Sequence, residues 1–223
     1  MIKKDKLDII FQDKSIIVVN KPHNLLTIST DNEKEKTLFH KVYNYEKQKH
    51  KNNKVFIVHR LDRETSGVVV FAKNERVKQI LQDNWSDLAK SRKYIAIVEG
   101  KVEKQNDTIK SWLNETKTLV SYSSNKKDDG KLAITKYNRL AFNKSYTLLD
   151  IEILTGRKNQ IRVHMKDIKH PIIGDKKYGA KINPLKRMGL HAYELTIKHP
   201  ISNEEIKFEA RIPSEFNKMF PKK

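Results

Sequence analysis

The chain has 223 residues, with 46 Lys or Arg against 27 Asp or Glu and a formal net charge of +19. Because the basic residues are spread along the chain and not gathered on one amphipathic helix, the excess favours a nucleic-acid partner over a membrane surface; a lysine-rich composition is the alternative explanation. The absence of cysteine excludes disulfides, thiolate metal sites and cysteine nucleophiles. No apolar run approaches the roughly 20 residues of a membrane span. We therefore expect a soluble cytoplasmic protein.

Short runs of β-branched or alternating apolar residues predict a chain dominated by strands. These runs occupy residues 7–11, 16–19, 55–58, 68–71, 92–98, 118–123, 132–139, 147–154, 193–197 and 206–212. Pro22 should end the second strand, because proline cannot donate to a sheet ladder. The last two runs are separated by a short turn and predict an antiparallel hairpin.

Helical spacing of apolar residues predicts three helices between the strands. Thr37 and Asn74 are the expected N-caps of the first two, and the third covers residues 158–168. The polar stretches 47–54 and 125–131 indicate loops. Because no regular βαβ rhythm appears, we expect an α+β protein with a mostly antiparallel mixed sheet.

A charged loop, residues 58–67 (VHRLDRETSG), lies between two of the apolar runs. Two buried strands would hold it rigidly, and rigidly held loops are where proteins often place reactive groups. Asp62 lies between Arg60 and Arg63, and nearby positive charge lowers a carboxyl pKa, so Asp62 should be ionised at pH 7. The residues alone leave two interpretations, a reactive carboxylate or a surface salt network that closes a tight turn.

A second candidate is residues 155–164 (TGRKNQIRVH), where a strand should end at Gly156 and a helix should begin. Arg157, Lys158 and Arg162 lie near the start of that helix. A helix N-terminus with added cations binds anions, so the segment suits a phosphate or a catalytic carboxylate. An ordinary basic helix is the alternative.

Metal and serine chemistry find little support in the sequence. No H-E-x-x-H or His-x-His pairing with nearby carboxylates appears among the eight histidines. Ser66 lies in no G-x-S-x-G context. Residues 170–179 (HPIIGDKKYG) contain two glycines but lack the P-loop and dinucleotide-binding patterns. We expect no metal site.

Six segments, taken in order, resemble the RluA-type pseudouridine synthases. They are IVVNKP (17–22), HRLDRETSG (59–67), KYIA (93–96), TGRKNQIRVH (155–164), PIIGD (171–175) and LHA (190–192). The resemblance covers nearly the whole chain. It implies the pseudouridine synthase catalytic fold, with a mixed sheet bent around a basic cleft, and the isomerisation of selected uridines in RNA.

The resemblance also implies roles for individual residues. Asp62 aligns with the essential catalytic aspartate of the family. Arg162 matches the basic group expected to pair with that aspartate. Tyr94 matches the tyrosine expected to stack on the target base. Arg60 matches the arginine expected to fill the space left by the flipped uridine. Flipping costs a few kcal/mol, which such contacts could offset. Whether Asp62 attacks C1′, adds to the base or abstracts a ribose proton stays open.

The same segments contain further RNA-binding candidates, namely Lys21, Arg157, Lys158 and His164. The expected partner is ribosomal or transfer RNA, whose phosphates would match the positive charge. The reaction adds and removes no atoms, so the resemblance implies no redox cofactor, nucleotide or metal. It also favours a monomer.

The sequence departs from the family pattern in two places. Lys158 and Asn159 stand where the family commonly has Thr-His, which puts contacts around the catalytic pair in doubt. Only a few residues precede the first predicted strand, so we expect one catalytic domain over residues 1–223, without the N-terminal S4-type domain of many relatives. RNA choice would then come from the catalytic domain itself, which favours a compact stem-loop or tRNA-like target.

Two other functions are open on the sequence alone. One is a catalytically inactive relative that binds RNA as a chaperone or assembly factor, although Asp62, Tyr94 and Arg162 all remain. The other is a metal-dependent nuclease, which also needs carboxylates beside cations.

Overall fold

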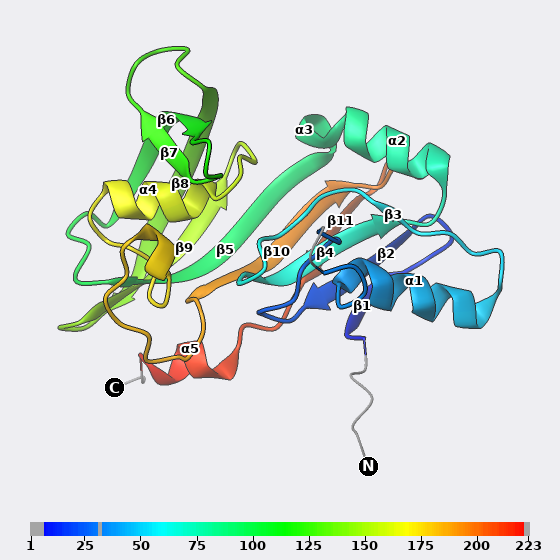
Figure 1. The fold of residues 1–223 in the computed structure, drawn as a ribbon, viewed down its shortest axis with the longest axis horizontal. Helices are drawn as coiled ribbons and strands as arrows, with labels where there is room; N and C mark the ends of the chain where they lie inside the picture. Colours follow the sequence, from blue (N-terminus) through cyan, green and yellow to red (C-terminus); the bar gives the residue numbers. More distant parts are fainter. Residues whose placement is uncertain (1–6, 31–32, 221–223) are drawn as a thin grey trace. The chain divides into compact units, whose positions relative to one another are not determined.

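The computed structural model describes residues 7–30 and 33–220 (Figure 1). The chain divides into two compact units, each built from two stretches distant in sequence. The first unit comprises Met1–Lys90 and Ala192–Arg211, and the second comprises Ser91–His191 and Ile212–Lys223. The expectation of a single catalytic domain stays a prediction, since compact units can still fold together as one domain.

The first unit contains antiparallel strands and three helices. Its strands are β1 (Ile9–Gln12), β2 (Ile16–Lys21), β3 (Phe56–Ile57), β4 (Ser66–Ala72), β11 (Glu205–Glu209) and most of β10 (Leu190–Lys198); its helices are α1 (Leu38–Lys49), α2 (Glu75–Asp83) and α3 (Trp85–Leu88). β1 pairs with β2, both β2 and β3 pair with β4, and β10 pairs with β11, all antiparallel. The predicted C-terminal hairpin is therefore confirmed.

Strand β4 is the best-covered strand of the first unit. All seven of its residues are buried, as expected where both faces of a strand are covered. On one face Val70 packs with Val77 and Leu81 of α2. On the other, Phe71 lies against Phe39 of α1, with ring centroids 6.4 Å apart. A strand held on both faces gives a rigid end to the loop that precedes it.

The starts of the first two helices are as predicted. The Thr37 hydroxyl accepts a hydrogen bond from the His40 N–H at 3.1 Å, and the Asn74 side-chain oxygen accepts one from the Val77 N–H at 2.9 Å. Each bond satisfies a backbone donor that has no partner within its helix. Strand β2 ends at Lys21, immediately before Pro22, as the sequence indicated.

Helix α1 extends to Lys49, so the predicted loop over residues 47–54 is wrong at its start. The reason is Glu46, which is fully buried. Its carboxylate lies 3.2 Å from the Lys49 ammonium and 3.3 Å from that of Lys73. These partners hold the last turn of the helix to the unit, although the sequence there is polar.

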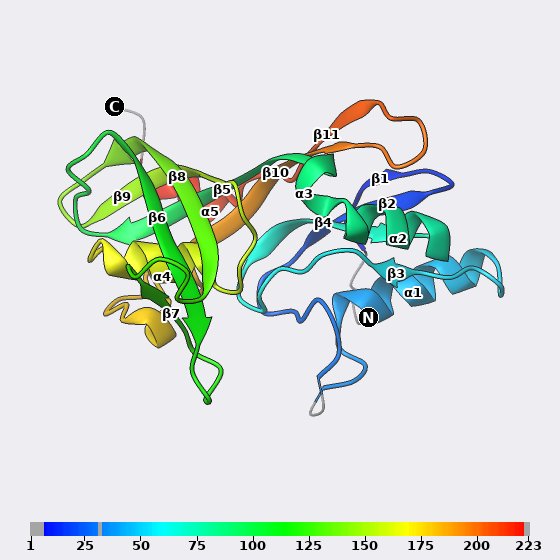
Figure 2. The ribbon, with the colours of Figure 1, turned by 90° about the horizontal axis from the view of Figure 1, so that it is seen from above.

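The second unit is a five-stranded antiparallel sheet with one long helix. It contains most of β5 (Ala89–Glu99), then β6 (Asn106–Glu115), β7 (Ser121–Ser124), β8 (Lys131–Phe142), β9 (Tyr146–Ile153), α4 (Gln160–Asp167), a 3-10 turn η1 (Lys176–Tyr178) and α5 (Ser214–Lys218). The strand order is β5-β9-β8-β6-β7. Helix α4 lies across one face of the sheet (Figures 1 and 2), where Ile161 and Met165 pack with Ala96, Leu149 and Ile151.

Strand β6 was not predicted. Its inward positions include Ser111, which is buried and lies 2.9 Å from His164 Nε2. A serine between Ile109 and Leu113 breaks the apolar alternation that marks a strand in the sequence. The polar partner on α4 makes that serine tolerable in the interior.

The predicted fold class is confirmed, since the two units together contain mostly antiparallel strands with a few interspersed helices. Within the part of the chain that the structure describes, no helix combines the length and apolar character needed to cross a membrane.

Candidate active site

The Asp62 loop is held through its backbone. Three consecutive carbonyls accept hydrogen bonds: that of Leu61 from the Thr27 hydroxyl at 2.7 Å, that of Asp62 from the Thr65 N–H at 3.2 Å, and that of Arg63 from the Lys21 ammonium at 3.0 Å. The Leu61 N–H donates back to the Thr27 hydroxyl at 3.2 Å. These bonds hold the loop through its main chain on both sides of Asp62.

Lys21 is the anchor of this loop. Its side chain is fully buried, and its ammonium donates to the carbonyls of Pro22 at 3.1 Å, Leu25 at 2.7 Å and Arg63 at 3.0 Å. An ammonium has three donors, and a buried one needs acceptors for them. This burial argues against the predicted contact of Lys21 with RNA. Its position instead fixes the loop from within.

Gly67 brings the loop into β4 at a position where only glycine fits. Its φ is +123°, and a Cβ there would lie 2.0 Å from the carbonyl oxygen of Ala192. The backbone of β10 therefore approaches β4 closely where the loop ends. This explains the Thr-Ser-Gly end of the segment more specifically than a general turn preference does.

The side chains of the loop differ in exposure. Asp62 is half-buried, whereas Arg60 and Arg63 are exposed. His59 accepts a hydrogen bond from the Val70 N–H at 3.1 Å, and its ring stacks on Trp85 with centroids 4.7 Å apart. The loop thus presents a partly shielded carboxylate beside an exposed guanidinium, Arg60.

Arg162 occupies a buried charged site in the second unit. Its guanidinium makes two hydrogen bonds of 2.7 Å to the Asp175 carboxylate, from Nε and Nη2, and one of 3.0 Å from Nη1 to the Asn159 side-chain oxygen. It also lies 4.9 Å from the centre of the Tyr178 ring. The sequence segments suggested no role for these three neighbours. These contacts hold the planar guanidinium in one orientation within the interior.

The turn before α4 is organised by Gln160. Its side-chain oxygen accepts from the Thr155 hydroxyl at 2.8 Å and from the Arg157 N–H at 3.0 Å, and its amide nitrogen donates to the Thr135 hydroxyl at 3.0 Å. Asn159, at φ 55°, adopts the left-handed conformation that asparagine tolerates. Its side chain does not cap the helix; its oxygen instead accepts a hydrogen bond from Arg162.

The remaining predicted residues of the second unit fall into two groups. Arg157 and Lys158 are exposed, and Lys158 forms an ion pair with Glu115. Tyr94 is half-buried on β5 and packs against the cluster beneath α4. Arg157 and Lys158 are therefore accessible to RNA, while Tyr94 combines an anchored ring with partial exposure.

His164 is fully buried. Its ring nitrogens lie 2.8 Å from the Thr135 hydroxyl and 2.9 Å from the Ser111 hydroxyl. Burial lowers the pKa of His164 to about 4, so the ring is neutral at pH 7. These observations argue against the predicted RNA contact and assign His164 to the interior, where it ties α4 to β6 and β8.

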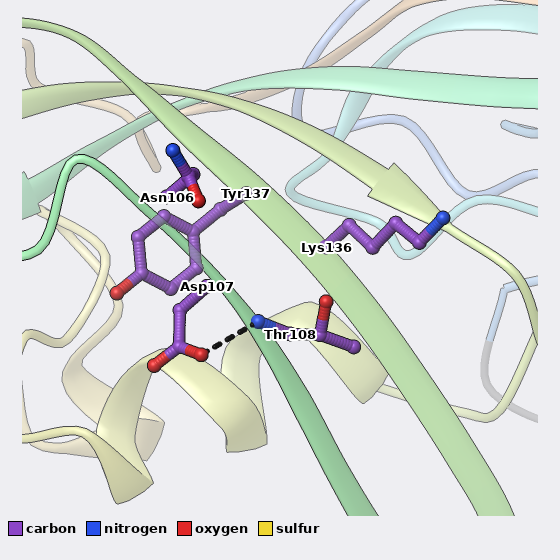
Figure 3. Close-up of a pocket in the computed structure, with 5 residues that line it drawn as sticks. All are labelled: Asn106, Asp107, Thr108, Lys136 and Tyr137. Carbon is purple, nitrogen blue, oxygen red and sulfur yellow. Dashed lines mark hydrogen bonds between the residues drawn. The ribbon is translucent and has the colours of Figure 1, made fainter.

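Asp62 does not line either of two open pockets. One lies on the β6–β8 pair of the second unit (Figure 3), lined by Asn106, Asp107, Thr108, Lys136 and Tyr137. The other borders the end of β2 in the first unit, lined by Leu7, Asp8, Asn20, Pro22, His23, Asn24, Leu25, Leu38 and Lys41. Within the described residues, no group of three or more His, Asp or Glu is arranged to hold a metal ion.

The structure places Asp62, Arg60 and Lys21 in the first unit and Tyr94, Arg157, Lys158, Arg162 and His164 in the second. It brings Asp62 together with the Lys21 anchor, and Arg162 together with Asp175. The predicted pairing of Asp62 with Arg162 joins residues of different units and stays a prediction.

Comparison with known sequences shows what these parts belong to. Residues 15–167 match the family described as RNA pseudouridylate synthase. An uncharacterised RNA pseudouridine synthase of Mycoplasma pneumoniae is 38% identical over 219 residues, covering 95% of this chain and 68% of that protein. The ribosomal large subunit pseudouridine synthase C of Rickettsia prowazekii is 36% identical over 221 residues, covering 94% of this chain and 69% of that protein.

The fold agrees. The human RNA pseudouridylate synthase domain containing 4 superposes with a TM-score of 0.78 at 24% identity, covering 94% of this chain and 90% of that one. Fold and sequence segments together define an RNA-modifying isomerase. The chain belongs to the RNA pseudouridylate synthase family, and its segments and relatives are of the RluA type.

Proposed function

We propose that this RNA pseudouridine synthase modifies specific uridines in ribosomal RNA, with Asp62 as the essential catalytic carboxylate. The observation that carries the proposal is the loop itself, in which the carbonyls of residues 61, 62 and 63 are all held by hydrogen bonds around a half-buried Asp62. A catalytic group needs a fixed position more than it needs a strong local interaction.

The chemistry explains what Asp62 must supply. Isomerisation breaks the bond from N1 of uracil to C1′ of ribose and forms a bond from C5 to C1′. The C5 hydrogen leaves as a proton, and N1 gains one, so atoms and electrons balance without a redox partner. An ionised carboxylate serves each route open to the family, whether it attacks C1′, adds to the base or takes a ribose proton.

Three further residues complete the proposed site. Arg162 pairs with the Asp62 carboxylate, while its bonds to Asp175 and Asn159 hold the guanidinium in place. Tyr94 stacks on the extruded uracil, and Arg60, exposed on the loop, occupies the space that the base leaves. Arg157 and Lys158 are exposed and contact phosphates.

Ribosomal RNA is favoured over transfer RNA because two relatives are named as ribosomal large subunit pseudouridine synthases C and D. Mapping pseudouridine in total RNA from cells with and without the gene identifies the target. Loss of a modification in transfer RNA alone would contradict this choice. We place the protein in the cytoplasm, whose reducing conditions suit a chain without cysteine. A monomer is proposed from the family resemblance alone.

Tritium release tests the reaction and the role of Asp62 together. RNA labelled with tritium at C5 of uridine should release tritium to water with the wild-type protein, and Asp62→Asn should release none. Glu64→Gln is the matched control, because it neutralises another half-buried carboxylate of the same loop. Release by Asp62→Asn at the wild-type rate would contradict the assignment. Absence of release from any cellular RNA would support a binding-only protein, and strand cleavage abolished by a chelator would indicate a nuclease.

A further inference from the structure

Asp175 and Arg162 form a buried ion pair. Arg162 is 6% exposed and Asp175 3% exposed, and two hydrogen bonds of 2.7 Å join them. We propose that Asp175 is a positioning residue of the reaction, which orients the Arg162 guanidinium toward the catalytic carboxylate. This inference rests on the proposed function, because it assumes that Arg162 pairs with Asp62.

The geometry of the pair fixes the direction of the guanidinium. Asp175 accepts from Nε and from Nη2, which lie along one edge of the planar group, and Asn159 accepts from Nη1. The Tyr178 ring lies 4.9 Å from the guanidinium carbon and restricts its plane. A planar group bound along one edge and one face cannot rotate without breaking charge-assisted bonds.

Stability alone is a poor explanation for this pair. Removing two charges from water costs several kcal/mol per ion, so buried ion pairs are often no more stabilising than well-packed apolar side chains. An arginine in a site that an apolar residue could fill therefore points to a use for its charge. Among the buried residues of α4, Arg162 alone carries a charge at neutral pH, since Gln160 and His164 are neutral and the others are apolar.

The segment that carries Asp175 is shaped to present it. Gly174 has φ +77°, and a Cβ there would lie 2.5 Å from the Arg187 carbonyl oxygen. The Asp175 carbonyl accepts from the Tyr178 N–H at 3.0 Å, which closes the turn η1. The turn brings a residue and the third one after it to the same side, so Asp175 and Tyr178 both meet Arg162. This geometry accounts for the glycine at position 174 and for the three-residue spacing between Asp175 and Tyr178.

The β6–β7 hairpin supports this site from the other side. Ser121, at the start of β7, is buried; its N–H donates to the Tyr178 hydroxyl at 3.2 Å, and its own hydroxyl accepts from the Asn159 amide at 3.3 Å. Two of the three groups around Arg162 are thus fixed by one residue. Such support of a functional group by neighbouring hydrogen bonds is what preorganisation requires.

The decisive variant is Asp175→Asn, which keeps the shape but removes the charge and one acceptor. We expect kcat for tritium release to fall by about a hundredfold, with KM for RNA changed less than about threefold, since the group acts after binding. Asp175→Glu keeps the charge but displaces it by one methylene, and should recover part of the lost kcat. Circular dichroism and thermal unfolding establish which variants are folded.

A double-variant cycle shows whether Asp175 acts through Arg162. In the Arg162→Lys background, Asp175→Asn should reduce kcat by less than about threefold, because a lysine has no edge for Asp175 to orient. A full, additive loss in that background would overturn the proposal. So would a folded Asp175→Asn with wild-type kcat, or a loss confined to RNA binding.

Two further outcomes separate this inference from its premise. If Asp175→Asn does not fold, Asp175→Glu decides, and a wild-type kcat for the folded Glu variant would overturn the proposal. If the wild-type protein releases no tritium, the proposed function fails. If the wild type is active and the folded variants match it, only the role of Asp175 fails.

Discussion

The Asp62 loop and the Arg162 site are held in opposite ways. The loop is fixed by bonds to its main-chain carbonyls, from Lys21, Thr27 and Thr65, and the Asp62 side chain takes no part in them. Arg162 is fixed by its own side chain, through Asp175 and Asn159. The first region is thus held by bonds to its backbone, whereas the second is held by bonds to the functional side chain itself.

The difference predicts how each region responds to substitution. A loop held through its backbone should keep its conformation when its central side chain changes. A charged side chain that is also a structural partner should not be removable without damage to its surroundings. Effects on catalysis and on folding should thus separate at Asp62 and coincide at Arg162.

The largest expected effect is at these two residues. Asp62→Asn should reduce kcat by about a thousandfold or more and lower the free energy of unfolding less than Arg162→Ala does, because the backbone bonds of its loop remain. Arg162→Ala should abolish turnover and also lower that free energy by about 3–5 kcal/mol, because Asp175 is left buried without its partner. Urea denaturation and tritium release measure both quantities. Equal destabilisation by the two variants would contradict the comparison.

The loop anchor provides the next test. Lys21→Met removes the ammonium while preserving most of the side-chain volume, and leaves the carbonyls of Pro22, Leu25 and Arg63 without this donor. The free energy of unfolding should fall by about 1–3 kcal/mol for the loss of buried partners, and kcat should fall because the loop loosens. Lys54→Met is the control, as Lys54 is exposed in the same unit. Matching behaviour of the two variants would contradict the role of Lys21.

The two regions also differ in how far the sequence predicts them. The Asp62 loop is contiguous, and its flanking apolar runs and its Gly67 indicate a rigid loop directly. The sequence did not indicate that Lys21 and His164 are interior groups, because charge suggests exposure and the acceptors that make burial possible are contributed by distant segments. Lys158 and Asn159 replace the usual Thr-His of the family. The sequence did not show that the Asn159 side chain accepts a hydrogen bond from Arg162.

The partners of Arg162 and strand β6 were not predicted, for a related physical reason. Asp175 is recognisable as part of a motif, but its pairing with Arg162 depends on the turn at Gly174 and on η1, which place two segments together. Ser111 of β6 is compatible with burial only because of its bond to His164. Polar partners within an interior are specified by tertiary structure, which residue periodicity does not report.

The buried histidine of the second unit yields a pH prediction. The pKa of His164 is lowered from 6.5 to about 4 by burial, so the unfolded chain takes up a proton first as pH falls. Its contribution to stability is complete above pH 6.5 and is lost between pH 6.5 and 4, amounting to about 3 kcal/mol at 1.36 kcal/mol per pKa unit. His164→Gln should lack this loss in urea titrations at pH 7 and pH 4.5. His50→Gln, at an exposed position, should retain it; an unchanged pH profile in His164→Gln would contradict the assignment.

The smallest expected effect concerns Arg60, which contributes to neither kind of internal support. Because Arg60 is exposed, Arg60→Ala should leave the free energy of unfolding within about 0.5 kcal/mol of the wild-type value. It should reduce kcat/KM by about tenfold if the guanidinium fills the space of the flipped base, with the salt dependence of RNA binding unchanged. A phosphate contact would instead lower the slope of log K against log salt by about 1. Arg63→Ala is the control, because it removes one positive charge from a neighbouring exposed position and so measures the general electrostatic attraction of the loop for RNA. A lowered salt slope in Arg60→Ala, or equal losses in both variants, would reassign Arg60 to phosphate binding.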